Sequence, residues 1–263
     1  MAKVNLFSQM VTDSRRSQPS VKLDIEKQYV EKIRTHPLRI AIRDKPLDAI
    51  SWQKYGTERY LAARSFMPLL RSSYAHANTA LRDQRLAGVL EQNIKDELGE
   101  SVGADGSHEE WRLDFYDSIG ISADLLATAK PSSAAISYRK TLERAATNPL
   151  QSIGVVHYLE VTIPFEFRAI LKGCERQFPN SFVLKEGDDE ITKALKRKSR
   201  KYLEDHIVHD MKEHFYQLKL AILPYLEDDA SRVEILNAMD MVESAKLRHM
   251  DFMYRTLFEQ KTN

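Results

Sequence analysis

Apolar residues recur along most of the chain at intervals of three and four positions, the spacing that places side chains on one face of an α-helix. No stretch alternates between apolar and polar residues as a half-buried strand does. We therefore expect an all-α protein that folds as a single bundle of about seven helices over residues 21–263, with residues 1–20 as a flexible lead-in. The pattern predicts helices near residues 22–36, 48–79, 82–98, 108–119, 132–146, 149–176, 188–224 and 229–259.

Prolines, glycines and a capping serine predict where these helices end. Pro37 should stop the first helix, because the residue before a proline disfavours the helical conformation. Gly99 lies just past a helix end, where a left-handed cap is common, and Ser107 suits the N-cap of the next helix. Pro68 should kink its long helix, and Pro164 should bend another.

The composition of the chain limits which partners and which cellular compartment we expect. The 263 residues include 43% hydrophobic ones and carry a formal net charge of +1, so no nucleic acid and no anionic membrane is expected as a partner. The basic run at 193–202 is interpreted as a solvated helix face. The single cysteine, Cys174, excludes an internal disulfide and indicates a reducing compartment. No apolar run approaches the roughly 18 residues of a membrane span, and no secretory signal precedes the domain, so we expect a cytoplasmic protein.

The segment from 204 to 215 contains the strongest chemical pattern. Residues four apart on a helix differ by only about 40° in direction, so His206, Asp210 and His214 form one ladder. Two imidazoles and a carboxylate on one face suit a transition metal such as iron. His209 and Glu213 form a neighbouring column that could support such ligands. The alternative is a polar helix face without a metal.

Three further residues add to this pattern. Glu160 is flanked by apolar residues, and a buried carboxylate must be paired, protonated or bound to metal. His157, one turn earlier, is interpreted as a core histidine. Glu97 ends one helix and His108 begins the next, and the glycine-containing loop between them can bring both to a common point. Each acid taken alone could equally be an exposed surface residue.

Together these segments supply three carboxylates and three imidazoles from separate helices. Carboxylate-rich sets in helix bundles commonly hold two irons, because carboxylate oxygens can bridge the metals. A structural zinc site would more often use cysteines. The candidate metal ligands are Glu97, His108, Glu160, His206, Asp210 and His214.

From about residue 35 onward, the sequence resembles the haem-oxygenase-like diiron oxidases and oxygenases, or iron-containing redox enzymes. The resemblance is carried by THPLRIAIRDKPLDAISWQKYGTERYLAARSF, by QNIKDELG with SHEEW, by IGVVHYLEVTIP and by DHIVHDMKEHF. Two features depart from the family pattern. The family places its last histidine three residues after the aspartate, where Glu213 stands here, and we choose His214 instead. The loop at 177–190 is interpreted as an insertion.

The resemblance implies a haem-oxygenase-like fold and two Fe(II) ions per chain. It implies activation of dioxygen to oxidise a small substrate, such as an amino acid or an amino-acid-derived metabolite, in a biosynthetic pathway. N-oxygenation, oxidative carbon–carbon cleavage and desaturation are the outcomes that it suggests. It leaves open an external electron donor and a homodimer.

Three alternatives compete with this hypothesis. A metal-free enzyme on the same scaffold, thiaminase-like or quinone-cofactor-forming, lacks the full ligand set, and the thiamin-degrading type uses a cysteine nucleophile. Cys174 lies away from the candidate ligands in sequence and is interpreted as structural. A haem oxygenase would need an axial histidine, for which only His36 is near the first helix. A binding module without chemistry is the third alternative.

Overall fold

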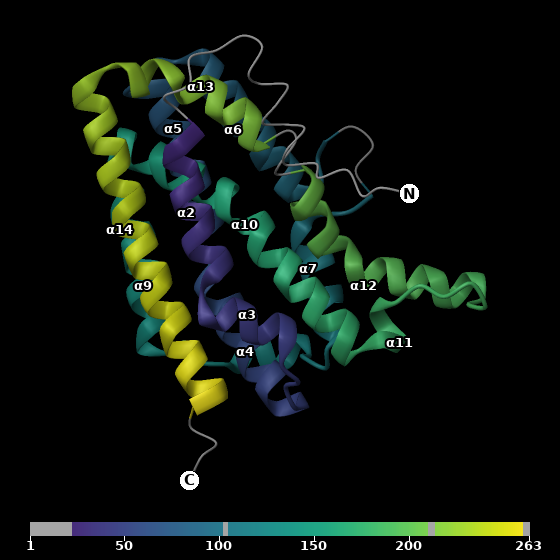
Figure 1. The fold of residues 1–263 in the computed structure, drawn as a ribbon. Helices are drawn as coiled ribbons and strands as arrows, with labels where there is room; N and C mark the ends of the chain where they lie inside the picture. Colours follow the sequence, from purple (N-terminus) through teal and green to yellow (C-terminus); the bar gives the residue numbers. More distant parts are fainter. Residues whose placement is uncertain (1–22, 102–104, 210–213, 260–263) are drawn as a thin grey trace.

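The computed structural model describes residues 23–101, 105–209 and 214–259, which contain helices and no strand (Figure 1). The predicted all-α bundle is therefore confirmed, and the predicted lead-in at 1–20 lies outside these ranges. No helix within them is long and apolar enough to cross a lipid bilayer. The helices are α2 (Leu23–Thr35), α3 (Pro37–Asp44), α4 (Ala49–Ala63), α5 (Phe66–Thr79), α6 (Gln84–Leu98), α7 (His108–Ser118), α8 (Ala123–Thr128), α9 (Ser133–Ala145), α10 (Pro149–Gln177), α11 (Pro179–Phe182), α12 (Glu190–His209), α13 (Phe215–Glu227), α14 (Asp229–Tyr254) and a terminal π-helical turn (Arg255–Glu259).

The described helices are nearly twice as numerous as the expected seven. The predicted long helix at 48–79 is interrupted at Arg64 and Ser65, which separate α4 from α5. Pro68 does not kink a continuous helix, because it stands in the first turn of α5, where its missing N–H needs no partner. Pro37 ends α2 as predicted and also begins the additional short helix α3.

The predicted helix boundaries between Glu97 and His108 are confirmed, whereas the helix predicted over 188–224 is described as α12, which ends at His209, and α13, which begins at Phe215. Gly99 follows α6 in the left-handed conformation, with φ of 72°. Ser107 caps α7: its side chain accepts a hydrogen bond from the backbone of Glu110, whose carboxylate accepts one from the backbone of Ser107 in return. These local signals fix where Glu97 and His108 lie along their helices.

The 29-residue helix α10 is the central element of the bundle (Figure 1). It packs against α2, α3, α5, α9, α12, α13 and α14. Its apolar side chains enter two separate core clusters. Those from Ile153 to Leu159 belong to one cluster, and Phe167, Ile170 and Cys174 belong to the other.

Two buried carboxylates, Glu160 and Glu166, occupy the part of α10 between these clusters. A buried carboxylate is stable only with cationic or hydrogen-bonding partners. Between the two apolar clusters, α10 therefore carries two acids that need partners from neighbouring helices.

The first half of α12 extends outward beside α11 (Figure 1). It contains the basic run, and several of these charges are paired with acids. Lys196 lies 2.6 Å from Asp188, and Arg200 lies 2.7 Å from Glu175. Local pairing of this kind reduces the positive potential that the run would otherwise present.

Candidate metal centre

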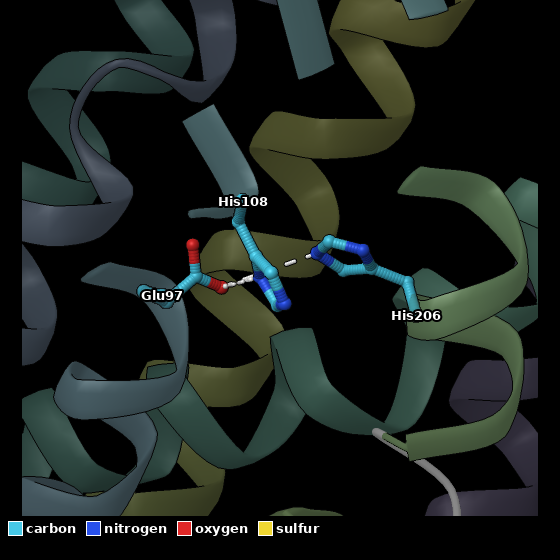
Figure 2. A group of neighbouring side chains, drawn as sticks. All are labelled: Glu97, His108 and His206. Carbon is cyan, nitrogen blue, oxygen red and sulfur yellow. Dashed lines mark ion pairs between the residues drawn. The ribbon is translucent and has the colours of Figure 1, made fainter. Parts of the chain in front are cut away.

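Glu97, His108 and His206 converge from α6, α7 and α12 (Figure 2). One ligand atom from each lies within 4.8 Å of the other two. The Glu97 Oε1 atom is 2.9 Å from His108 Nδ1 and 3.9 Å from His206 Nε2. Both imidazoles are buried. Three of the six predicted ligands therefore form one compact cluster of nitrogen and oxygen donors.

The loop between α6 and α7 brings Glu97 and His108 together, as the sequence predicted. Gly99 and Gly106 both have positive φ, and the backbones of the two glycines touch so closely that a Cβ at Gly99 would lie 2.6 Å from the Gly106 carbonyl oxygen. Only glycine tolerates both the conformation and the approach. The chain therefore turns back sharply enough for the end of α6 to face the start of α7.

Protein acceptors orient both histidines of this cluster. His108 Nε2 lies 3.0 Å from Asp205 Oδ2, and His206 Nδ1 lies 2.8 Å from the Tyr202 carbonyl oxygen. A neutral imidazole has one N–H, and here that N–H is directed to the acceptor. The lone pairs of His108 Nδ1 and His206 Nε2 are thereby left on the side of Glu97, as in metal sites whose ligands are held by outer hydrogen bonds.

The contact between His108 and Glu97 supports this assignment. His108 is buried, and its Nδ1 atom lies 2.9 Å from Glu97 Oε1. With a proton on Nδ1 this contact is an ion pair, and once that proton leaves, the nitrogen and the oxygen both direct lone pairs into one space. Such a pair is suited to a shared cation, and a mixed imidazole and carboxylate set suits iron.

His214, directly before α13, repeats the arrangement. Its Nε2 atom lies 2.8 Å from Asp96 Oδ2, while its Nδ1 atom lies 3.9 Å from Glu160 Oε2. The Asp96 carboxylate is itself held by Gln92 and by Ser101. One nitrogen of His214 is therefore held by α6, and the other faces the buried carboxylate of α10.

The remaining predicted residues differ in outcome. Asp210 and Glu213 lie outside the described ranges, as does the side chain of His209, so the middle of the predicted ladder stays a prediction. His157 is a core histidine, as predicted: its Nε2 atom lies 2.9 Å from Glu26 and its ring stacks on Phe215.

The charges of the cluster follow from its geometry. Burial raises the pKa of Glu97, but the neighbouring His108 and His206 outweigh it and lower this pKa to about 2. Burial lowers the pKa of His108, but Glu97 and Asp205 raise it to about 10. Without metal the pair is therefore a carboxylate and an imidazolium, and a metal cation would take the place of the imidazolium proton.

The residues on which the haem oxygenase and the cysteine-dependent alternatives depend, His36 and Cys174, are both unsuited to those roles. His36 caps α3 by accepting the Leu38 N–H at Nδ1, and its Nε2 atom lies 3.1 Å from Asp251, so both nitrogens are engaged away from the cluster. Cys174 is buried in the second apolar cluster, and burial raises the pKa of its thiol far above the ordinary value. It lacks the exposure and thiolate character of a nucleophile.

Asp96, Asp205 and the Tyr202 carbonyl were not identified from sequence. Asp96 and Asp205 each stand next to a predicted ligand, but adjacent helical residues differ by about 100° in direction, so adjacency does not predict a shared site. A backbone carbonyl carries no sequence signal at all. The only available indication was that candidate metal histidines need an acceptor for their second nitrogen.

A cavity of about 110 Å³ adjoins the cluster. Glu97, Glu160 and His206 line one part of it, and the rest extends among α4, α9, α10 and α14. This position gives a small molecule room beside the candidate ligands. Its apolar lining includes Phe66, Leu142, Leu159, Ile163 and Met250.

Comparisons with known proteins show the family and the fold of the chain. A protein-family model described as iron-containing redox enzyme matches residues 53–246. A CADD-like protein of unknown function from Nostoc punctiforme PCC 73102 superposes with a TM-score of 0.67 at 16% identity, covering 89% of this chain and 97% of that one. A domain of unknown function with a haem oxygenase-like fold from Shewanella denitrificans OS217 superposes with a TM-score of 0.67 at 14% identity, covering 99% of this chain and 97% of that one. A TenA homolog from Pseudomonas syringae pv. tomato DC3000 superposes with a TM-score of 0.67 at 12% identity, covering 89% of this chain and 91% of that one. No curated protein sequence matches the chain.

Proposed function

The chain belongs to the family of iron-containing redox enzymes and has a haem oxygenase-like fold, and from this premise we propose that it is a non-haem diiron oxidase or oxygenase. Its substrate is a small molecule, an amino acid or an amino-acid-derived metabolite. The similar solved structures support the fold alone, since their identity to the chain is at most 16%. The assignment of chemistry therefore depends on the residues of the cluster.

One observation carries the proposal. Each of three imidazoles has one nitrogen engaged by an outer acceptor, and its other nitrogen faces a carboxylate in the interior. Core histidines that serve only packing have no need of such a common orientation, whereas metal ligands do. The three acceptors are Asp205, the Tyr202 carbonyl and Asp96.

The donors divide into two groups. Glu97, His108 and His206 would hold one iron. Glu160 and His214 would hold the second, together with Asp210 as the sequence predicts. When bound, the irons would supply the electrons and open coordination positions for oxygen chemistry.

The protein would contribute orientation and exclusion of water. Asp205 and Tyr202 fix the rings of His108 and His206, and this limits the reordering that metal binding requires. Apolar side chains such as Phe66, Leu142 and Met250 form part of the wall of the cavity, and a substrate packed against them would be separated from bulk water. These functions belong to the chain, whereas the redox chemistry belongs to the metal.

A metal-free, thiaminase-like activity is less well supported. The TenA homolog shares the fold at 12% identity. A shared fold does not imply a shared activity, so this similarity does not support a TenA-like reaction. The only cysteine is buried and outside the cavity.

Iron content tests the proposal. The purified chain is stripped with a chelator, loaded with ferrous iron without oxygen, desalted and analysed by inductively coupled plasma mass spectrometry. We expect close to two irons per chain, and we expect His206→Ala to lose them with unchanged circular dichroism. Oxygen uptake is then recorded against a panel of amino acids, and one class should stimulate it. A wild-type chain that is folded and retains no iron would contradict the proposal.

A further inference from the structure

The cavity beside the candidate iron ligands also contains a group of buried charges. Arg39, Glu166 and Lys246 line it. The Glu166 Oε2 atom lies 2.6 Å from Arg39 Nη2, and its other oxygen contacts the Lys246 ammonium. Both oxygens of this carboxylate are therefore already engaged by cations.

Arg59 adds a further cation to the same cavity, and no carboxylate in the described part of the chain forms an ion pair with it. Its Nε atom is buried and makes no hydrogen bond. The groups that act on its charge include the phenols of Tyr116 and Tyr202 and the carboxylate of Glu166, whose two oxygens are already engaged by Arg39 and Lys246. Arg59 is thus a half-buried cation, and the one acid named as acting on it is shared with two other cations.

Phe167 places this guanidinium beside the candidate iron ligands. The Arg59 Cζ atom lies 4.2 Å from the centre of the Phe167 ring, and that ring is centred 4.7 Å from the His206 ring. An arginine stacked on an aromatic face keeps its N–H groups directed outward in the plane, where they can pair with a planar anion.

A charge count shows what the cavity lacks. Arg39, Arg59, Arg112 and Lys246 are the four cations of its lining. Among the ion pairs of the described residues, Arg112 pairs with Glu109, and Glu166 pairs with Arg39 and Lys246. The other acids of the lining, Glu97 and Glu160, belong to the candidate iron ligands. A half-buried guanidinium that has no ion pair of its own is costly, so an anion beside Arg59 would be favoured.

We propose that Arg59 binds the carboxylate of the substrate and thereby fixes its position beside the irons. This inference rests on the proposed function and specifies its substrate class as an organic acid. A carboxylate matches the two parallel N–H donors of a guanidinium. The apolar walls at Phe66, Leu159 and Ile163 would receive the carbon skeleton of the acid.

Binding to the metal-free full chain tests this role. Straight-chain carboxylates from butanoate to decanoate are titrated by isothermal calorimetry, each beside its neutral amide. Because iron is absent, a carboxylate has no metal to coordinate. We expect at least one acid of the series to bind at millimolar concentration or below, and its amide to bind at least tenfold more weakly.

Variants then assign the effect to Arg59. Arg59→Gln should weaken binding of the acid at least tenfold, and Arg59→Lys should recover part of it. Arg64→Gln, at an exposed position on the end of the same helix, should bind like the wild type.

Three results would each overturn the inference: equal binding of acid and amide, unchanged binding in Arg59→Gln, or no binding by any acid of the series. If Arg59→Gln does not fold, the comparison of acid with amide and the affinity of Arg59→Lys still test whether Arg59 binds the carboxylate. Iron loading is measured separately. A chain that binds acids through Arg59 but retains no iron would contradict the proposed function and leave this inference intact.

Discussion

The Nε2 atom of His108 lies 3.0 Å from the Oδ2 atom of Asp205, on the side of the ring opposite Glu97. Asp205 thus sets which nitrogen of His108 faces the candidate iron. Asp205→Ala should lower ferrous affinity by about 10- to 100-fold, as loss of such outer partners commonly does. Anaerobic titration with a competing chelator measures this affinity.

The matched control for that prediction is Glu190→Gln. Glu190 is an exposed acid on the same helix, with 80% of its side chain accessible. It should bind iron like the wild type. Equal affinity of Asp205→Ala and wild type would show that Asp205 has no part in metal binding.

Glu160 and His214 are assigned to the second iron, which gives a stoichiometric prediction. Glu160→Gln should lower the iron content from about two to about one per chain, because the amide keeps the size of the side chain but is a poorer ligand. Metal analysis after desalting measures this. The control is Glu175→Gln, on the same helix and away from the cluster, which should retain both irons. Two irons per chain in Glu160→Gln would show that Glu160 is not an iron ligand.

Gly173 allows α10 to approach α3. A Cβ at this position would meet the Ile42 carbonyl oxygen at 2.4 Å. Gly173→Ala should therefore lower the free energy of unfolding by about 1–3 kcal/mol, as overpacking does. Gly88→Ala is the control, because nothing lies within 4 Å of a Cβ there, and helix propensity should raise stability by up to about 1 kcal/mol. Urea unfolding of both variants measures the difference, and similar effects of the two would contradict the packing argument.

Glu166 should make stability depend on acid pH. Burial raises its pKa, but Arg39 and Lys246 outweigh this and lower the pKa from 4.5 to about 2. A carboxylate whose pKa is lower in the folded state stabilises the fold above its unfolded pKa, and this contribution disappears as pH falls through the folded pKa. The contribution is on the order of 3 kcal/mol at neutral pH.

Glu166→Gln should consequently be less stable than wild type at pH 7, and the difference should shrink between pH 4.5 and 2. Urea unfolding of the metal-free proteins across this range measures it. A difference that stayed constant with pH would show that folding does not shift the pKa of this carboxyl.

Cys174 should be unreactive in the native protein. Its side chain is buried and burial raises the pKa of the thiol, so a thiol reagent should label it only after unfolding. The reagent 5,5′-dithiobis(2-nitrobenzoic acid), with and without guanidinium, provides the measurement. Rapid labelling of the native chain would show a reactive thiol and would support the thiaminase-like alternative.

Local signals made much of the fold predictable. Pro37, Gly99 and Ser107 act through their own backbone or immediate neighbours, so their effects could be inferred from sequence. The break at Arg64 and Ser65 also has a local cause, because Pro68 has no N–H to donate to the Arg64 carbonyl and its ring would clash with that carbonyl in a continuous helix. Sequence predicted a kink at Pro68, whereas the structure has a full break four residues earlier.

The candidate site was predictable to a similar degree. His206 was identified by helical spacing, and Glu97 and His108 by the glycine-containing loop between them and by the family resemblance, and the structure brings the three together. The Tyr202 carbonyl and the cavity cations were not identified, because their proximity depends on how distant helices pack. Arg39 and Glu166, for example, are 127 positions apart and separated by 2.6 Å.

Glu97 is the last residue but one of α6 and His108 is the first of α7, whereas Glu160 is in the middle of α10. Amide protons near helix ends exchange through small local openings, while those in the centre of the most enclosed helix exchange only when the whole domain unfolds. Deuterium uptake should therefore distinguish the two groups of donors. Iron should slow exchange markedly around Glu97 and His108 and leave the already slow exchange at Glu160 almost unchanged.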